Sequence, residues 1–451
     1  MALSHKIRFA SQTDVGIKRS HNQDACSAQP APDEKHFRAV GHVFVVADGM
    51  GGHAVGEKAS AKAVREIPLT YQKHVGPEGP EDAIRRAFRE ANAGIYQIGA
   101  ANPEFKGLGT TGIALFLRPE GVWIGHVGDS RVYRIREAAV EQLTFDHSWV
   151  WEMARRQGID PDELGDFKRN VIIRSLGPEA EVEIDIEGPY PIEPGDSFLM
   201  CSDGLTNHVK PDELGAVVST FPAAEACGFL VELANLRGGS DNITCLIVQV
   251  PRGDGTTSTG DDNPKPRSGM SGLLTWWGNR VSWPLTCLGL GGGLVALSIW
   301  MKMGNIPGFV VAFVLAAMLT LVGLGGLALQ LRKKMDDGSE ADDAAAAREL
   351  HVYKSYPYAI DGAMSARFAE LERDAKARLA ERQMTYDEAA VAKLAAAFEA
   401  KAAAGDWPAA FRAKCQVVVL YAALLNKHQQ KDEVFKPNWT TPFRPMNGQA
   451  G

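Results

Sequence analysis

The sequence has few cysteines, no excess of positive charge and no apolar segment near its N-terminus. Its six cysteines are scattered without a Cys-x-x-Cys pair, which argues against structural zinc and a disulfide framework and favours a reducing compartment. A net charge of -7 with a pI near 5.9 gives no indication of nucleic-acid binding. Residues 1–30 lack the apolar core of a signal peptide, so we expect the N-terminal part to remain in the cytoplasm.

Length and composition divide the chain into segments. At 451 residues it is long enough for two or three domains, because a single core seldom grows past about 250 to 300 residues. Residues 1–250 are typical of one mixed domain. The Gly-, Asp-, Thr-, Ser- and Pro-rich composition that follows indicates a linker over 251–280. We expect two membrane spans within 281–331 and a helical tail over 332–451.

Two long uncharged runs predict a transmembrane hairpin. Val281–Met301 has 21 residues without a charge and Met303–Leu331 has 29. At about 1.5 Å per residue the first run spans about 31 Å, which matches a hydrocarbon core of about 30 Å. A pair of buried core helices is the alternative. Arg280 and the basic residues 332–334 flank the spans, so the positive-inside rule places both ends in the cytoplasm.

The tail is rich in Ala, Glu, Lys, Arg and Leu, which are strong helix formers. This composition predicts helices over Ala363–Gln383 and Asp387–Asn426. The segment 404–408 (Ala-Gly-Asp-Trp-Pro) indicates a turn between two antiparallel helices. A plain helical hairpin is favoured over a tetratricopeptide unit, because one copy shows no repeat.

Apolar patterns predict the elements of residues 1–250. The run Val43–Ala47 predicts a buried strand that leads Asp48 into a glycine-rich turn and then a helix. The segment 80–82 (Pro-Glu-Asp) begins a second helix with apolar residues at helical spacing. A hairpin is expected from Gly112–Leu117 and Val122–Arg136. Further strands are expected at Ile7–Ala10, Asp24–Ser27, Ser197–Cys201 and Ile243–Val250, and further helices at Ser148–Gln157 and Cys227–Leu236.

Several aspartates lie at the ends of predicted strands beside glycine, in the set Asp24, Asp48, Asp129, Asp203 and Asp241. Each alone is compatible with a solvated carboxylate in a turn. If neighbouring strands bring the set together, its negative charges repel unless cations neutralise them. Oxygen ligands without histidine or cysteine favour Mg²⁺ or Mn²⁺ over zinc. Two such ions about 3.5 to 4 Å apart clamp a phosphoryl group and lower the pKa of a bridging water.

Seven short motifs occur in a fixed order along residues 5–250: RSHNQD, VVADGMGGH, GTT, VGDSR, RSLG, CSDGL and GSDNIT. In order and rough spacing they resemble the metal-dependent protein phosphatase (PPM) family, also called protein phosphatase 2C. The DGMGG form is similar to the bacterial branch. The resemblance implies an α+β fold, an α-β-β-α four-layer sandwich of two antiparallel sheets flanked by helices. It also implies hydrolysis of phosphoserine and phosphothreonine in proteins.

The resemblance assigns roles to individual residues. Asp48, Asp203 and Asp241 are implied to be catalytic and direct ligands of two Mn²⁺ or Mg²⁺ ions, with the Gly49 carbonyl as a further ligand. Asp24 is implied to bind through water, and Asp129 to help hold a third, looser ion. Arg19 is implied to grip the substrate phosphate; a surface salt bridge is the alternative. The implied chemistry is in-line attack by a hydroxide that bridges two ions, without a phosphoenzyme.

Two positions depart from the family pattern. Gln23 stands where many members have glutamate, which predicts weaker binding of the second ion. Met50 stands where animal members have a histidine proposed as general acid, and methionine cannot donate that proton. His53 and His147 are nearby candidates, although a structural role is the commoner one for each. The polar segment Gln157–Asn170 matches the family's flap, which tunes substrate access.

These observations predict a bacterial Ser/Thr phosphatase anchored in the inner membrane, with its catalytic domain and tail in the cytoplasm. Its expected partners are phosphorylated proteins, a Ser/Thr kinase whose action it opposes, and membrane lipid around 281–331. A phosphatase-like scaffold that binds phosphoproteins without turnover is one alternative. A phosphohydrolase of a non-protein substrate is another. The tail is a candidate for docking a partner.

Overall fold

The computed structural model describes residues 6–51, 56–164, 171–252 and 350–432, with scattered helical positions between 295 and 320. The described residues of 1–253 and 350–451 form one compact unit, and 254–349 belongs to a second. The predicted linker and transmembrane hairpin lie almost wholly outside the described residues, so both stay predictions.

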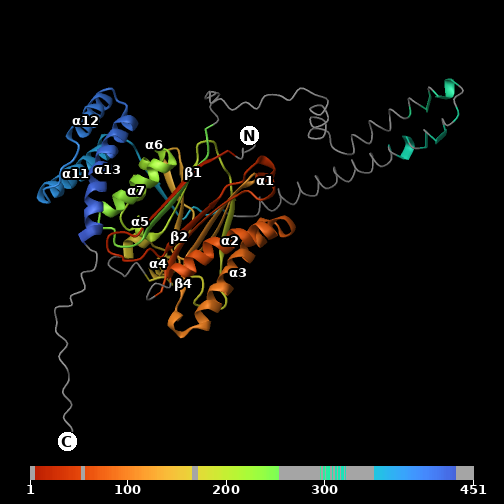
Figure 1. The fold of residues 1–451 in the computed structure, drawn as a ribbon, viewed down its shortest axis with the longest axis horizontal. Helices are drawn as coiled ribbons and strands as arrows, with labels where there is room; N and C mark the ends of the chain where they lie inside the picture. The colour runs from red at the N-terminus through yellow and green to blue at the C-terminus, as the bar shows by residue number, and fades with distance from the viewer. Residues whose placement is uncertain are drawn as a thin grey trace, which may run out of the picture. The chain divides into compact units, whose positions relative to one another are not determined.

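Two antiparallel sheets form the centre of the first unit (Figure 1). One has the strand order β1-β11-β10-β7-β8-β12, and the other has the order β2-β3-β5-β6-β9, with β4 paired to β3. The strands of the first sheet are β1 (Arg8–Asp14), β7 (Arg131–Arg136), β8 (Ala139–Gln142), β10 (Ser197–Cys201), β11 (Ile243–Gln249) and β12 (Lys354–Pro357). Those of the second are β2 (Asp24–Gln29), β3 (His42–Met50), β4 (Gly109–Thr110), β5 (Gly112–Arg118), β6 (Gly121–Val127) and β9 (Asp185–Tyr190).

Helices cover the outer face of each sheet. α2 (Gly56–Glu78) and α3 (Pro80–Ala101) pack on the second sheet, while α6 (Pro211–Thr220) and α7 (Ala223–Leu236) pack on the first. Shorter helices are α1 (Glu34–Ala39), α4 (Trp149–Gln157), α5 (Asp203–Thr206), η1 (Pro103–Phe105) and η2 (Pro161–Leu164). The tail contributes α11 (Gly362–Glu381), α12 (Glu388–Ala403) and α13 (Trp407–Asp432).

Strand β3 shows why the predicted apolar run is buried on both faces. Val43 and Val45 pack against α2 and α3, whereas Phe44 and Val46 contact the opposite sheet. Successive side chains of a strand point to opposite faces, so a strand covered on both sides needs a continuous apolar run. The predicted arrangement of two antiparallel sheets flanked by helices is confirmed.

The predicted strand Val122–Arg136 is wrong, because the structure divides it between the two sheets. β6 ends at Val127 and β7 begins at Arg131. Gly128 between them has φ +114°, and a Cβ there would lie 2.6 Å from the Thr111 side chain. A residue with a side chain is strained in such a conformation, so the glycine permits the sharp turn. The division carries Asp129 to the edge of the sandwich.

Other predicted elements agree closely with the structure. The strand Ser197–Cys201 is β10, and α4 starts immediately after Ser148, whose side chain accepts a hydrogen bond from the Trp151 amide. α7 begins four residues before the predicted Cys227. The elements α1, α6, β8, β9 and β12 were not predicted.

The tail packs on the first sheet's helical layer. Figure 1 shows its helices beside α6 and α7. The Phe368 ring of α11 lies 5.9 Å from the Phe229 ring of α7 and 4.9 Å from the Phe411 ring of α13. The predicted break at 404–408 separates α12 from α13, with Gly405 at φ +75°. The tail and residues 6–252, called the body below, thus share one apolar core.

Within the described residues, one helical stretch, Trp407–Lys427 of α13, has the length and apolar composition to cross a membrane. Half of its most apolar window is buried in the unit, because α13 packs against α7 and α11. This stretch is not part of the predicted hairpin over 281–331, which therefore gains no confirmation from it.

Candidate functional site

The two sheets bring the predicted acidic residues together at one edge of the sandwich. Asp24 and Asp48 lie opposite each other in the β2–β3 register. Asp203 follows β10 and begins α5, and Asp241 precedes β11, which pairs with β10. Asp129 lies in the turn from β6 to β7. The negative charges of the other four carboxylates all act on Asp48, so the five form one cluster.

Hydrogen bonds across the two sheets hold this edge in place. Ser202 Oγ donates to Asp24 Oδ2 at 2.7 Å, and the Gln23 amide donates to Asn242 Oδ1 at 2.8 Å. Asn242 Nδ2 in turn donates to the carbonyls of Val15 and His21 at 2.9 Å. Because each bond joins segments about 180 residues or more apart in the chain, the cluster depends on the complete sandwich.

The backbone of Asp48 is fixed by two threonines of the GTT motif. The Asp48 amide donates to Thr111 Oγ1 at 2.9 Å, and its carbonyl accepts from the Thr111 amide at 2.8 Å and from Thr110 Oγ1 at 2.9 Å. The next residue, Gly49, lies in close backbone contact with two other segments, since a Cβ there would overlap the Gly56 carbonyl and lie 2.6 Å from the Gln23 carbonyl. The Asp48 carboxylate therefore projects from a rigid backbone.

Burial raises the pKa values of Asp24, Asp48, Asp129 and Asp203, and the repulsion between neighbouring carboxylates adds to that effect. The pKa of Asp24 rises to about 7 and that of Asp129 to about 8. The pKa of Asp48 lies well above its ordinary value, and the pKa of Asp203 is raised as well. Groups in such surroundings resist ionisation unless positive charge is supplied.

The oxygen atoms of the cluster are available to a cation. Within the described part of the chain, Asp24 Oδ1, Asp129 Oδ1 and Asp203 Oδ1 are buried and accept no hydrogen bond. Buried carboxylate oxygens without donors are costly in a folded protein. A hard divalent cation such as Mg²⁺ or Mn²⁺ prefers oxygen ligands of this type. The residues present therefore fit the predicted ions.

Arg19 lies at the exposed rim of the cluster. Its Nη2 donates to Asp241 Oδ2 at 2.8 Å, and its side chain is 51% exposed. The structure thus places the guanidinium beside a predicted metal ligand, where it faces solvent. Both the phosphate-binding role and the surface salt bridge considered from the sequence are compatible with this position.

Gln23 and Met50, which depart from the family pattern, and the two histidine candidates for a general acid have different surroundings. Gln23 acts through its backbone, since its carbonyl accepts from Ser60 Oγ at 2.5 Å and from the Gly49 amide at 3.1 Å. Met50 ends β3 beside the cluster. His53 lies outside the described residues. His147 is buried, and its Nδ1 accepts from the Gly128 amide at 3.0 Å, so it holds the turn that carries Asp129.

A second group of potential ligands, His126, His147 and Asp185, is better explained as a hydrogen-bonded network. Because His147 Nδ1 accepts a hydrogen bond, its proton resides on Nε2, which lies 3.0 Å from Asp185 Oδ2. A metal at that nitrogen would require loss of this proton. Arg174 also donates to Asp185 Oδ1 at 2.7 Å, and its positive charge opposes a cation. The group therefore fits a structural role.

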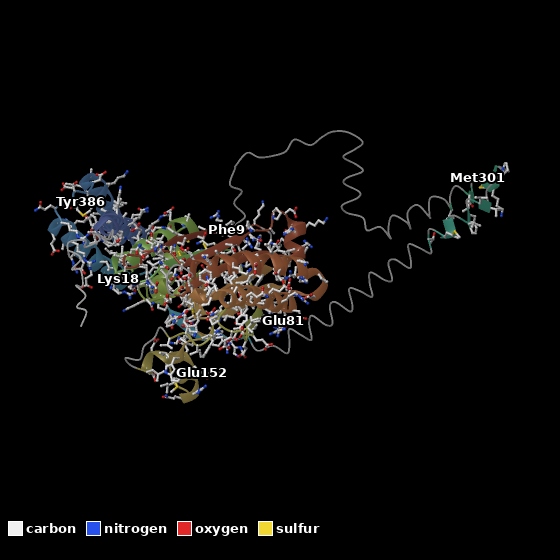
Figure 2. All side chains as sticks on the ribbon, turned by 60° about the horizontal axis from the view of Figure 1, so that its bottom comes forward. Phe9, Lys18, Glu81, Glu152, Met301 and Tyr386 are labelled. Carbon is white, nitrogen blue, oxygen red and sulfur yellow. The ribbon has the colours of Figure 1, made fainter. Side chains whose placement is uncertain are left out.

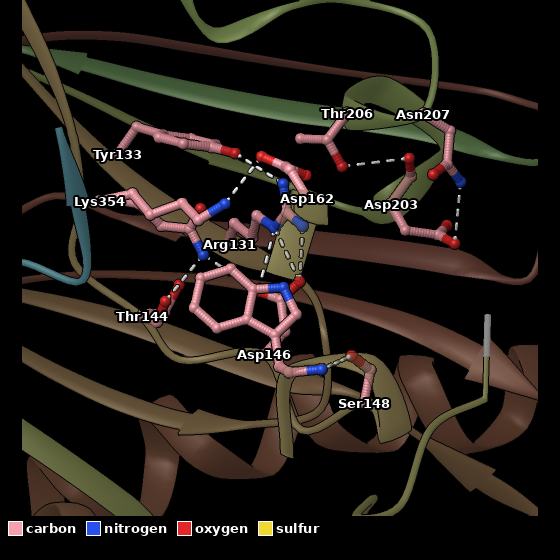
Figure 3. Close-up of polar contacts among 12 residues, drawn as sticks. Arg131, Tyr133, Thr144, Asp146, Ser148, Asp162, Asp203, Thr206, Asn207 and Lys354 are labelled. Atoms are coloured by element: carbon pink, nitrogen blue, oxygen red, sulfur yellow. Dashed lines mark hydrogen bonds and ion pairs between the residues drawn. The ribbon is translucent and has the colours of Figure 1, made fainter. Parts of the chain in front are cut away.

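A pocket of about 380 Å³, not predicted from the sequence, adjoins the carboxylate cluster and shares Asp129 and Asp203 with it. The pocket is lined by a bidentate ion pair in which Arg131 Nε and Nη2 donate to Asp146 at 3.0 and 2.6 Å (Figure 3). Arg131 belongs to the VGDSR motif, but no pattern indicated its partner. Asn207 Nδ2 donates to Asp203 Oδ2 at 3.1 Å and was also missed.

Comparisons with known proteins agree on one family. A family model described as protein phosphatase 2C matches residues 17–233. The serine/threonine phosphatase stp of Listeria monocytogenes is 35% identical over 243 residues, which are 53% of this chain and 94% of that protein. A solved serine/threonine phosphatase of S. agalactiae is 31% identical, covers 54% of this chain and 100% of its own, and has a TM-score of 0.49.

A solved catalytic domain of the serine threonine protein phosphatase PstP in complex with 2 manganese ions is 29% identical. The match covers 54% of this chain and 98% of that chain, with a TM-score of 0.45. These similarities cover about half of this chain, and residues 350–432 lie outside the matched family model.

Proposed function

This chain belongs to the protein phosphatase 2C family and is a metal-dependent protein serine/threonine phosphatase, and we propose that it works with two Mn²⁺ or Mg²⁺ ions while anchored to a membrane. The observation that carries the two-ion proposal is the cluster of five buried or partly buried aspartates at the sheet edge, three of which have buried oxygens without hydrogen bonds. Phosphoproteins are its implied substrates.

We assign the metal-holding roles to the clustered residues. Asp48, Asp203 and Asp241 would hold the two ions directly, with the Gly49 carbonyl as a further ligand, and Asp24 would act through water. When bound, the ions neutralise the carboxylates and activate a water molecule for attack on phosphorus. Asp129, at the border between the cluster and the pocket, is suited to a third ion.

Arg19 is the proposed phosphate-binding residue. Its guanidinium is half exposed and lies 2.8 Å from Asp241, so it can exchange this partner for a phosphate at the rim without moving far. A planar fork of donors matches two phosphate oxygens, which orients the phosphorylated residue toward the cluster.

The test uses the full chain in detergent, stripped of metal, on a phosphothreonine peptide with and without Mn²⁺ or Mg²⁺. Metal-dependent phosphate release should disappear in Asp203→Ala and persist in Asp374→Ala, a matched control at an exposed position of α11. No release from folded wild-type protein at any metal concentration would favour the alternative of a scaffold that binds phosphoproteins without turnover.

Substrate class is tested separately. The metal ligands contact the phosphate and not its leaving group, so they permit a phosphohydrolase of nucleotides or sugar phosphates as a second candidate. Comparison of kcat/KM for phosphopeptides, nucleotides and sugar phosphates decides between them. A higher kcat/KM for phosphopeptides supports a protein substrate and a Ser/Thr kinase as the opposing enzyme.

Membrane anchoring through 281–331 rests on the two uncharged runs and their basic flanks. The full chain should stay in the membrane fraction after an alkaline wash, and a variant with 281–331 replaced by a Gly-Ser linker should become soluble. Protease applied to the outer face of spheroplasts should leave both ends intact if the hairpin has the proposed orientation. Recovery of the full chain in the soluble fraction would contradict the anchor.

A further inference from the structure

The pocket beside the carboxylate cluster is built partly by the tail. Its lining includes Asp129 and Asp203 of the cluster and also Tyr356 of β12. Strand β12 lies about 100 residues after β11 in the chain and outside the matched family model. A wall of the pocket therefore comes from a segment that the family's common core does not supply.

Strand β12 is firmly attached to the first sheet. It pairs antiparallel with β8 from Lys354 opposite Gln142 to Pro357 opposite Ala139. Just outside the strand, the Tyr353 amide donates to the Gln142 carbonyl at 2.9 Å and the Tyr358 amide donates to the Ala138 carbonyl at 3.0 Å. Hydrogen bonds on both sides of a short strand keep its side chains in a fixed register.

Lys354 links this strand to the α4–η2 segment, Trp149–Leu164, on the other side of the pocket. Its Nζ lies 2.7 Å from Asp160 Oδ1 and 5.4 Å from the centre of the Trp151 ring. It also lies 2.8 Å from Asp162 Oδ2 (Figure 3). The lysine side chain is only 10% exposed. Burial lowers the pKa of Lys354, but the two carboxylates more than offset this and leave it raised.

The geometry of these contacts favours positioning over stabilisation. Asp160 and Asp162 are 46% and 61% exposed, and ion pairs with exposed partners contribute little to global stability. The α4–η2 segment nevertheless projects from the sheets, with Glu152 on α4 at its margin (Figure 2). A fixed cation between its two aspartates holds the projecting end at one distance from Tyr356.

We propose that Lys354 is a positioning residue that holds the α4–η2 segment over the pocket. Through this contact the tail controls how tightly the phosphatase binds the peptide residues that flank the phosphorylated residue. This inference rests on the proposed function of the adjoining cluster. A small aryl phosphate reaches the cluster without occupying the pocket, whereas a phosphopeptide requires both.

The test compares Lys354→Met with Lys414→Met in the full chain. Lys414 is a matched control, because its Nζ is also 2.7 Å from a carboxylate, 4.4 Å from an aromatic ring centre and 11% exposed, but it lies within the tail. Lys354→Met should raise KM for a phosphothreonine peptide by about fivefold to tenfold, with little change in kcat/KM for para-nitrophenyl phosphate. Lys414→Met should change neither value.

Two further variants separate positioning from structure. Lys354→Arg retains the charge, so its KM for the phosphothreonine peptide should stay close to the wild-type value. In a variant carrying Asp160→Asn and Asp162→Asn, adding Lys354→Met should have no further effect, because the same contact is already lost. An unchanged peptide KM in Lys354→Met, or an equal loss of kcat on both substrates, would overturn the proposal.

Hydrogen exchange gives a reading that does not depend on catalysis. The amides of Trp149–Leu164 should exchange faster in Lys354→Met than in wild type or Lys414→Met. Unchanged exchange would refute the positioning role. If the wild-type chain hydrolyses neither substrate, the proposed function fails, and the exchange measurement still decides whether Lys354 holds the segment.

Discussion

The shared core between tail and body predicts that one tail residue governs the stability of the catalytic unit. Phe368 of α11 is fully buried between the Phe229 ring of α7 and the Phe411 ring of α13. Replacing a buried phenylalanine by alanine costs about 3 to 5 kcal/mol, because apolar contacts are lost and a cavity remains. The compact unit spans roughly 350 residues. At about 2.1 cal/mol/K of unfolding entropy per residue, Phe368→Ala should lower its thermal midpoint by about 4 to 7 °C.

The assay must follow the catalytic body and not the tail alone. The residual activity of the full chain on para-nitrophenyl phosphate, measured during heating, reports the body. Phe398→Ala is the control, because Phe398 lies on α12, is only partly buried and contacts Lys414 of the tail. We expect the control to shift the midpoint by less than a third of the Phe368→Ala shift.

A double-mutant cycle with Phe229→Ala extends the test across the interface. The stacked pair should show a coupling of about 1 kcal/mol beyond the two single effects. If Phe368→Ala melts the tail helices but leaves the inactivation temperature of the body unchanged, the tail is an independent unit and the reasoning is refuted.

Three further predictions concern the site and its supports. Mn²⁺ at a hundredfold excess over its Kd should stabilise the full chain by about 2.7 kcal/mol for each bound ion in calorimetry, and Asp203→Asn should remove most of this gain; a metal-independent midpoint would contradict the ion site. Gly204→Ala should abolish most activity, since its Cβ would overlap the Asn242 carbonyl beside Asp241, whereas a Cβ at Gly76 meets nothing within 4 Å and Gly76→Ala should leave kcat unchanged. Burial opposes ionisation of Asp185, but His147 and Arg174 lower its pKa to about 2, below its ordinary value. Its charge therefore stabilises the fold by roughly 2 kcal/mol above pH 4, and the stability difference from Asp185→Asn, measured in urea, should shrink as the pH falls toward 2; a constant difference would refute this.

The acidic residues could be predicted because each follows a simple local rule. Asp48 lies near the end of β3 and Asp203 follows β10, each beside glycine, and such strand ends are rigid but exposed to ligands. The family motifs supplied the implied roles of these residues, and the strand order became known only from the structure. Ser202 and Asn242 lie inside two of those motifs, yet their roles as links between the sheets became evident only when the sheets were placed face to face.

The misplaced and missing elements have physical causes. The segment Val122–Arg136 contains two buried strands, β6 and β7, and the change of sheet at the Gly-Asp-Ser segment between them depends on the backbone angle of Gly128. The tail helices were predicted from composition, but an alanine-rich sequence does not specify the surface on which a helix packs. β12 is short and polar, so its pairing with β8 is a tertiary effect that no local pattern indicates.

The long interval between β11 and β12 has a consequence for biosynthesis. Roughly 100 residues separate the two strands. At a ribosomal rate of about 5 to 20 residues per second, the body waits some seconds with the outer edge of β8 unpaired and the apolar face of α7 uncovered. The proposed membrane spans are made within that interval. A nascent chain that follows this order completes the pocket beside the carboxylate cluster only after residues 281–331 have been synthesised, so insertion of the proposed hairpin would place the completion of the pocket at the membrane.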